Sequence, residues 1–130
     1  MRLVDTDIAI DHFHGNPFAR DFFNKTLEAG DSLCISVVTL TELLAGMRPG
    51  EEELTQKLLS LFVVLDVNET IGYKAGEYLR LYSRSHNLDL GDAIIAATAM
   101  LNDADLVTRN IKHYPMPDVR VSIPYERGRK

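Results

Sequence analysis

Five acidic residues stand out because each lies next to the end of an expected strand or the start of an expected helix: Asp5, Asp7, Glu42, Asp89 and Asp92. Carboxylates that converge on one point repel one another, and a hard divalent cation such as Mg²⁺ or Mn²⁺ relieves the repulsion by taking oxygen ligands. A cation held in this way lowers the pKa of water and stabilises charge on a phosphate. These residue types therefore permit metal-assisted hydrolysis if the fold brings them together.

Asp5 and Asp7 flank the start of the first expected helix. Asp5 directly follows the apolar pair Leu3-Val4, where a carboxylate is unfavourable unless it is paired, hydrogen-bonded or bound to metal. The alternative interpretation of Asp5 is a turn former at the end of a strand. Asp7 precedes an apolar run, and we interpret it as a helix N-cap rather than as a direct metal ligand.

Glu42 and Asp92 also have good structural interpretations when each is taken alone. Thr39 and Glu42 have the spacing of a capping box, in which the Glu side chain reaches back to the start of its helix. Asp89 suits an N-cap, and Asp92 would then be an acid in the first helical turn, where the helix dipole favours it. No single acid decides between structure and chemistry, so the combination must carry the argument.

The elements that would position these acids alternate along the chain. Apolar runs predict strands at residues 2–5, 33–36, 62–67, 105–108 and 119–123, and amphipathic patterns predict helices at residues 7–14, 18–27, 38–47, 51–61, 69–86 and 91–102. This alternation predicts an α/β fold with a mostly parallel sheet. Ligands in such folds bind beyond the carboxyl ends of the strands, where the topology could gather four separated segments.

Composition predicts one globular domain spanning residues 1–130. The chain has 45% apolar and 25% charged residues and a single cysteine, Cys34, which excludes a disulfide framework within the chain and is typical of a reducing compartment. No apolar run approaches the roughly 20 residues that a membrane-spanning helix needs. Asp5 and Asp7 do not fit a signal peptide. We therefore expect a cytoplasmic protein without a membrane association.

The net charge of −5 argues mildly against nucleic-acid binding, because contacts with phosphates require cations. The argument is weak where acids surround bound metal ions, since the ions offset the local negative charge. Charge alone therefore leaves a nucleic-acid substrate open.

Four segments together resemble the PIN-domain family, and specifically its VapC-like toxin branch. They are LVDTD at residues 3–7, VTLTELLAG at 38–46, LGDAIIAATA at 90–99 and LVTRNIKHY at 106–114. They occur in the order found in the family, and the resemblance covers nearly the whole chain. Each motif is weak to moderate alone, and all four in order are strong.

The resemblance implies an α/β/α sandwich with a metal site at one edge of a parallel sheet. Asp5, Glu42 and Asp92 match the three principal acids of the family, which hold Mg²⁺ or Mn²⁺. Many members have a fourth acid where this chain has Asn110, although other members have Asn there as well. A neutral amide oxygen binds a cation more weakly than a carboxylate does, so we expect Asn110 to orient a metal-bound water. The resemblance therefore leaves open whether one or two metal ions bind.

The activity implied by the resemblance is cleavage of RNA. A metal-activated water would attack the phosphodiester in line and leave 5′-phosphate and 3′-hydroxyl products. Arg109, Lys112 and Arg48 are candidates for contacts with substrate phosphates. The basic tail at residues 127–130 is most simply a frayed end, or alternatively a contact for RNA or a partner. The resemblance also implies a cognate antitoxin protein and a homodimer.

Two other functions compete with this interpretation. The sequence Asp5-Thr6-Asp7 after a strand also resembles the nucleophile motif of haloacid-dehalogenase-like phosphatases, but Ala9 and Ala96 stand where that class usually has other residues, and the chain is short for it. The second alternative is a non-catalytic RNA-binding scaffold on the PIN fold. The presence of all three acids argues against a scaffold.

Overall fold

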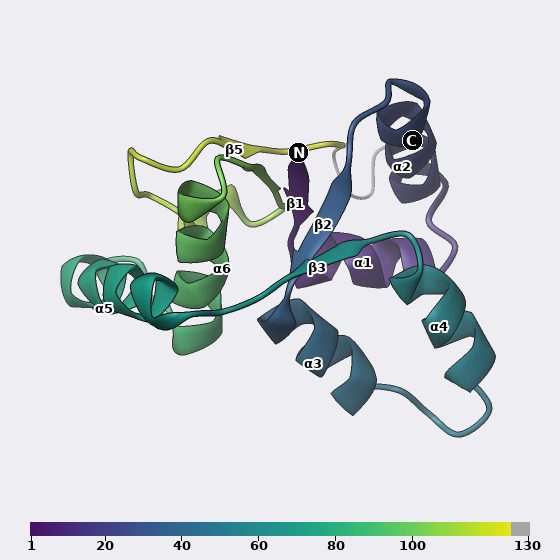
Figure 1. Ribbon diagram of the computed structural model, residues 1–130, viewed down its shortest axis with the longest axis horizontal. Helices are drawn as coiled ribbons and strands as arrows, with labels where there is room; N and C mark the ends of the chain where they lie inside the picture. Colours follow the sequence, from purple (N-terminus) through teal and green to yellow (C-terminus); the bar gives the residue numbers. More distant parts are fainter. Residues whose placement is uncertain (126–130) are drawn as a thin grey trace.

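The computed structural model describes residues 1–125, which form a five-stranded sheet with helices on both faces (Figure 1). The strand order is β3-β2-β1-β4-β5, and all four pairings are parallel. The strands are β1 (Arg2–Val4), β2 (Leu33–Ser36), β3 (Val63–Leu65), β4 (Asp105–Val107) and β5 (Val121–Ser122). The predicted α/β fold with a parallel sheet is therefore confirmed, and each strand falls within its predicted range.

Six α-helices and one 3₁₀ helix connect the strands. They are α1 (Thr6–Phe13), α2 (Pro17–Glu28), α3 (Val37–Ala45), α4 (Glu52–Leu59), α5 (Glu69–Tyr82), α6 (Leu90–Leu101) and the 3₁₀ helix η1 (Ile111–His113). The sequence did not predict η1, and the predicted helix at 69–86 ends four residues earlier, at Tyr82. The basic tail at 127–130 lies outside the described residues. Within the described part of the chain, no helix combines the length and the apolar character needed to cross a membrane.

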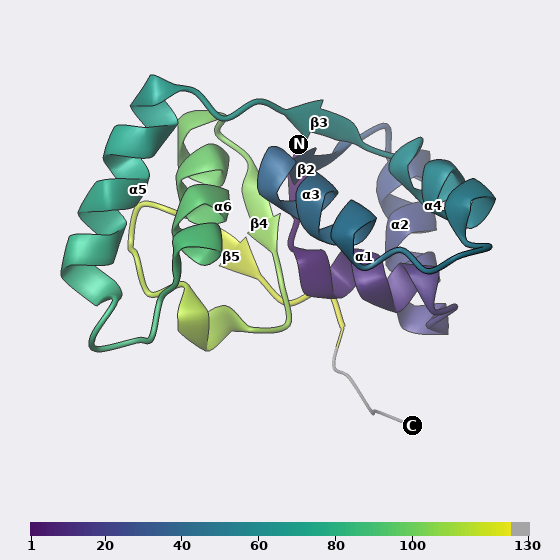
Figure 2. The same ribbon diagram turned by 90° about the horizontal axis from the view of Figure 1, so that it is seen from below.

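Successive residues of a strand point to opposite faces of the sheet, and here they feed two separate cores. Leu3 and Leu106 belong to the core under α5 and α6, whereas Val4 and Val107 belong to the core under α1, α2 and α4. Figure 2 shows α5 and α6 on one side of the molecule and α1, α2 and α4 on the other. The central strands are buried on both faces, which is why they form short, continuous apolar runs in the sequence.

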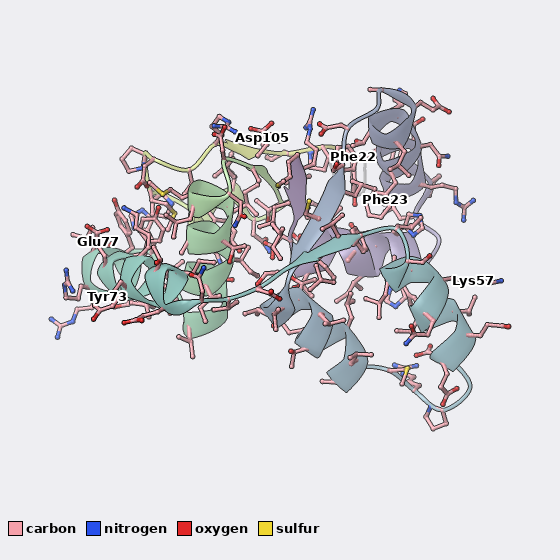
Figure 3. All side chains as sticks on the ribbon, viewed as in Figure 1. Phe22, Phe23, Lys57, Tyr73, Glu77 and Asp105 are labelled. Carbon is pink, nitrogen blue, oxygen red and sulfur yellow. The ribbon has the colours of Figure 1, made fainter. Side chains whose placement is uncertain are left out.

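Side chains far from the sheet follow the same division between core and solvent. Phe23 is 1% exposed and packs edge-on against Phe62, whereas Tyr73 is 76% exposed. In Figure 3, Glu77 and Lys57 lie at opposite sides of the molecule and point away from the sheet. Among the described residues, the buried apolar side chains thus form two cores.

Two predicted helix caps are wrong, and both errors concern the ends of strands. The N-cap of α1 is Asp5, whose side chain accepts a hydrogen bond from the backbone N of Thr6, and not Asp7. The N-cap of α3 is Ser36, so Glu42 lies in the second turn and forms no capping box with Thr39. The third prediction is confirmed, because Asp89 caps α6 by accepting from the backbone N of Asp92 at 2.8 Å.

Candidate active site

A cavity of about 170 Å³ opens at the carboxyl ends of the strands. It draws its lining from three loop and helix-start segments and from α3, which lie far apart in the sequence. The lining residues are Asp5, Thr6, Asp7, Glu42, Asp89, Gly91, Asp92, Ile95 and Asn110. All four site residues predicted from the sequence, Asp5, Glu42, Asp92 and Asn110, therefore face the same space, together with two acids that the sequence assigned to caps.

Asp5 is the most firmly held of these acids. Asp5 is only 6% exposed and is the single residue between β1 and α1. Oδ1 accepts from the backbone N of Thr6 at 2.8 Å, and Oδ2 accepts from Thr108 Oγ1 at 2.8 Å and from the Tyr114 hydroxyl at 3.0 Å. Three donors thus balance a buried carboxylate and fix its orientation.

Glu42 is exposed at the surface of α3 but is tied to α1. Its Oε1 accepts a hydrogen bond of 2.6 Å from Thr6 Oγ1. The hydroxyl of Thr39, which is fully buried, lies 2.9 Å from the same Thr6 oxygen and can donate to it. The pair of threonines therefore holds Glu42 toward the cavity across the junction between α1 and α3.

Asp92 lies in the first turn of α6 and faces Asp5 across the cavity. Its Oδ1 lies 3.3 Å from the Tyr114 hydroxyl, whose single proton is shared between Asp5 and Asp92, and its Oδ2 lies 3.6 Å from His113 Nδ1. Burial raises the pKa of Asp92 to about 6, and the negative charges of Asp89 and Asp5 add to the increase. The ionised form of Asp92 is therefore held in an unfavourable environment within the described protein.

Asp7 is part of the same cavity, although the sequence assigned it to a cap. Its Oδ2 accepts from the backbone N of Arg109 at 3.1 Å and from Asn110 Nδ2 at 3.3 Å. Its Oδ1 is buried and has no hydrogen-bond partner among residues 1–125. Burial, followed by the charge of Asp5, raises the pKa of Asp7 to about 6. Asn110 thus contributes a donor to an acid, and Asp7 adds a carboxylate to the three that the sequence predicted for the site.

Arg109 is engaged in the fold and is not free for a substrate. Its guanidinium donates to both oxygens of Asp11, from Nε at 2.7 Å and from the second nitrogen at 3.3 Å. Asp11 is 7% exposed and also accepts from the Tyr125 hydroxyl at 2.9 Å. The ion pair fixes the loop whose backbone reaches Asp7. Of the three basic residues considered for phosphate contacts, Lys112 and Arg48 remain exposed.

The residues present fit a hard divalent cation. Among the described residues that line the cavity there is no His or Cys, and the donors are carboxylate and amide oxygens, which Mg²⁺ and Mn²⁺ prefer. Two observations indicate that positive charge is missing from this cavity. The Oδ1 atom of Asp7 has no hydrogen-bond partner among the described residues, and the pKa values of Asp7 and Asp92 are raised. Within residues 1–125 no three such side chains are already close enough to enclose an ion, so the carboxylates must draw together to coordinate one.

Comparison with known proteins gives one family. The sequence model of the PIN domain matches residues 2–118. The chain is 44% identical to Ribonuclease VapC10 of Mycobacterium tuberculosis over 117 residues, which are 89% of this chain and 87% of that protein. It is 39% identical to Ribonuclease VapC19 of the same organism over 122 residues, which are 92% of this chain and 98% of that protein.

Solved structures have the same fold. A toxin–antitoxin complex from Klebsiella pneumoniae contains a chain with a TM-score of 0.76 and 32% identity, covering 97% of this chain and 99% of that one. The DNA-bound VapBC of Salmonella typhimurium contains a chain with a TM-score of 0.80 and 23% identity, covering 95% of this chain and 98% of that one. The second similarity concerns the fold alone.

Proposed function

Because the chain belongs to the PIN-domain family, among its VapC-like ribonucleases, we propose that it is the RNA-cleaving toxin of a toxin–antitoxin pair, with Asp5, Glu42 and Asp92 holding a catalytic Mg²⁺ or Mn²⁺. The observation that carries the proposal is that these three acids, from distant parts of the sequence, line one cavity at the carboxyl ends of parallel strands. Ligands bind at this edge in open parallel sheets.

In this mechanism a divalent cation supplies a polarised water near neutral pH and stabilises charge on the phosphodiester. Asp5 offers a carboxylate whose orientation is fixed by Thr6, Thr108 and Tyr114. Glu42 is held to α1 by the hydroxyl of Thr6. Asn110 directs its amide nitrogen to Asp7 and leaves its carbonyl oxygen to orient the attacking water.

The partners follow from the same assignment. The chain from Klebsiella pneumoniae that is 32% identical belongs to a toxin–antitoxin complex, and we propose a cognate antitoxin for this chain as well. We propose RNA as the substrate, because the relatives VapC10 and VapC19 are named ribonucleases. We further propose that the protein works as a homodimer in the cytoplasm, and that residues 1–130 form one domain. A phosphatase or a non-catalytic scaffold is not favoured, because the two relatives at 44% and 39% identity are named ribonucleases.

Cleavage of total cellular RNA by the purified protein tests the site. We expect cleavage with Mg²⁺ or Mn²⁺, none with EDTA, and recovery when the metal is restored. We expect the cleavage rate to fall at least a hundredfold in each of the variants Asp5→Asn, Glu42→Gln and Asp92→Asn. Their far-UV circular dichroism spectra should match that of the wild type. Glu53→Gln, an exposed acid on α4, is the matched control and should cleave like the wild type.

Two results would overturn this proposal. Cleavage that persists in EDTA would exclude the metal, and an active Asp92→Asn variant would exclude the assigned site. Trapping of a phosphorylated Asp5 would instead support the phosphatase alternative.

A further inference from the structure

The side chain of Tyr114 connects two of the acids that face the cavity. Tyr114 directly follows η1, is 4% exposed and packs in the core under α5 and α6. Its hydroxyl lies 3.0 Å from Asp5 Oδ2 and 3.3 Å from Asp92 Oδ1. Asp5 follows β1 and Asp92 belongs to α6, so the tyrosine is the hydrogen-bonding link that joins the sheet edge to this helix at the cavity.

We propose that Tyr114 is a positioning residue that sets which oxygens of Asp5 and Asp92 are available to the cation. Asp5 Oδ2 already accepts from Thr108 and Tyr114, which uses both of its lone-pair sites, whereas Oδ1 accepts only from the backbone N of Thr6. The same hydroxyl has a single proton, which it shares between Asp5 Oδ2 and Asp92 Oδ1 at 3.3 Å, so Asp92 Oδ2 is the oxygen that this contact leaves entirely open. Asp5 Oδ2 is thus the fully occupied oxygen, and the lone pairs available to a cation lie on Asp5 Oδ1 and on Asp92.

The hydroxyl, and not the aromatic ring, carries this role. A phenylalanine would fill the same space in the core but would donate nothing to the two carboxylates. A buried tyrosine hydroxyl needs a hydrogen-bond partner, and both available partners are acids of the proposed metal site. Burial and the charges of Asp5 and Asp92 raise the pKa of Tyr114 above its ordinary 10.0, so the hydroxyl keeps its proton and remains a donor.

The energetic reason is the mutual repulsion of the two acids. The neutral Tyr114 hydroxyl shares its proton between the two carboxylates, so it reduces their repulsion when no cation is bound. The same contacts restrict the rotation of both carboxylates. Hydrogen bonds from outside a metal's ligand set orient those ligands, and their loss typically weakens metal binding by about ten- to a hundredfold. This inference rests on the proposed function, because it assumes that Asp5 and Asp92 are metal ligands.

The test measures Mn²⁺ binding by titration calorimetry on the full chain without RNA, for the wild type and for Tyr114→Phe. We expect Mn²⁺ affinity to fall about tenfold or more in the variant. In cleavage assays the Mn²⁺ concentration needed for half-maximal rate should rise by a similar factor, and saturating Mn²⁺ should restore most of the wild-type rate. A structural defect alone would lower the plateau rate without moving the metal dependence.

Tyr78→Phe is the matched control. Tyr78 is 2% exposed, lies in the same core and donates its hydroxyl hydrogen bond to Asp118 at 2.7 Å, away from the cavity. It should lose thermal stability, as Tyr114→Phe does, but keep the wild-type affinity for Mn²⁺. Equal Mn²⁺ affinity in the wild type and Tyr114→Phe, or an equal loss in both Phe variants, would overturn the positioning role.

Asp92→Asn in the same titration separates this inference from the proposed function. If Asp92→Asn loses Mn²⁺ binding and Tyr114→Phe does not, only the role of the tyrosine is wrong. If Asp92→Asn binds Mn²⁺ like the wild type, the proposed metal site is wrong, and the positioning role falls with it.

Discussion

Replacing Asp92 by Asn should make the metal-free protein more stable while it removes the activity. Burial, followed by the charges of Asp89 and Asp5, raises the pKa of Asp92 from 3.8 to about 6, which means that folding disfavours its ionised form. Asn has nearly the same shape and no charge, and its carbonyl oxygen can still accept from Tyr114. The variant therefore removes the unfavourable charge and leaves the surrounding contacts in place.

The size of the gain follows from the pKa shift. A shift of two pKa units corresponds to about 3 kcal/mol of difference between the two protonation states. The side chain of Asp92 is 22% exposed, and water screens part of its interactions with Asp89 and Asp5. We therefore expect the free energy of unfolding in EDTA at pH 7.5 to increase by roughly 1 kcal/mol, which is readily resolved by urea denaturation.

The pH dependence identifies the cause of the gain. A carboxyl whose pKa is higher in the folded state binds its proton more tightly there, so the wild type loses stability as the pH rises from about 4 to about 6. Well below its ordinary pKa of 3.8 the carboxyl is protonated in both states, and Asp92→Asn should gain nothing there. The difference in the free energy of unfolding between variant and wild type should therefore increase between pH 4 and pH 6 and stay constant above pH 7.

Urea denaturation in EDTA at pH 4.5, 6.0 and 7.5 measures this dependence. Asp103→Asn is the control, because hydrogen bonding to Arg120 lowers the pKa of Asp103, and its removal should bring no gain at any of these pH values. Two results would refute the reasoning. One is an Asp92→Asn variant that is less stable than the wild type at pH 7.5, and the other is a gain in the free energy of unfolding that is the same at all three pH values.

Two further substitutions probe the loop after β4. Arg109→Ala leaves Asp11 buried without its ion-pair partner, so urea denaturation should show a free energy of unfolding lower by about 3 kcal/mol. Arg109→Lys should recover part of this loss. A loss below about 1 kcal/mol in Arg109→Ala would contradict the role of the ion pair. Asn110→Asp replaces a donor to Asp7 with a like charge, so thermal melts should show a lower midpoint in EDTA and a larger increase on adding Mn²⁺. An unchanged midpoint in EDTA would show that the two side chains do not interact.

Much of the fold could be predicted because the central strands are buried on both faces. Burial on both faces produces short apolar runs such as residues 33–36, and these alternate with amphipathic helices of ordinary length. The errors lie where a strand passes directly into a helix. Ser36 ends β2 and caps α3, and Asp5, the single residue between β1 and α1, caps α1. Turn signals are absent there, so the sequence placed both helix starts too late.

The candidate site could be predicted only in part, and the missing part depends on distant contacts. Asp5, Glu42 and Asp92 lie in recognisable motifs. The sequence favours a helix cap for Asp7, because the donors that bring it into the cavity come from Arg109 and Asn110, more than 100 positions away. Local patterns contain no information about such pairs.

Tyr114 did leave a signal in the sequence, but its meaning depends on the structure. The aromatic position after the Thr-x-Asn segment has a tyrosine here, and a hydroxyl in a buried position must find a partner. Only the folded structure, in which the hydroxyl lies 3.0 Å from Asp5 Oδ2 and 3.3 Å from Asp92 Oδ1, identifies the partners as these two acids.

The distribution of charge resolves the conflict between an acidic chain and an RNA substrate. Within residues 1–125, five acidic residues line the cavity: Asp5, Asp7, Glu42, Asp89 and Asp92. Among residues 1–125 the cavity therefore gathers as many negative charges as the full sequence carries in net charge, −5. Grouped negative charge in a cleft concentrates cations and repels phosphate. Binding of a divalent cation should therefore precede productive binding of RNA, because it reverses the local repulsion at the point where the phosphodiester must approach.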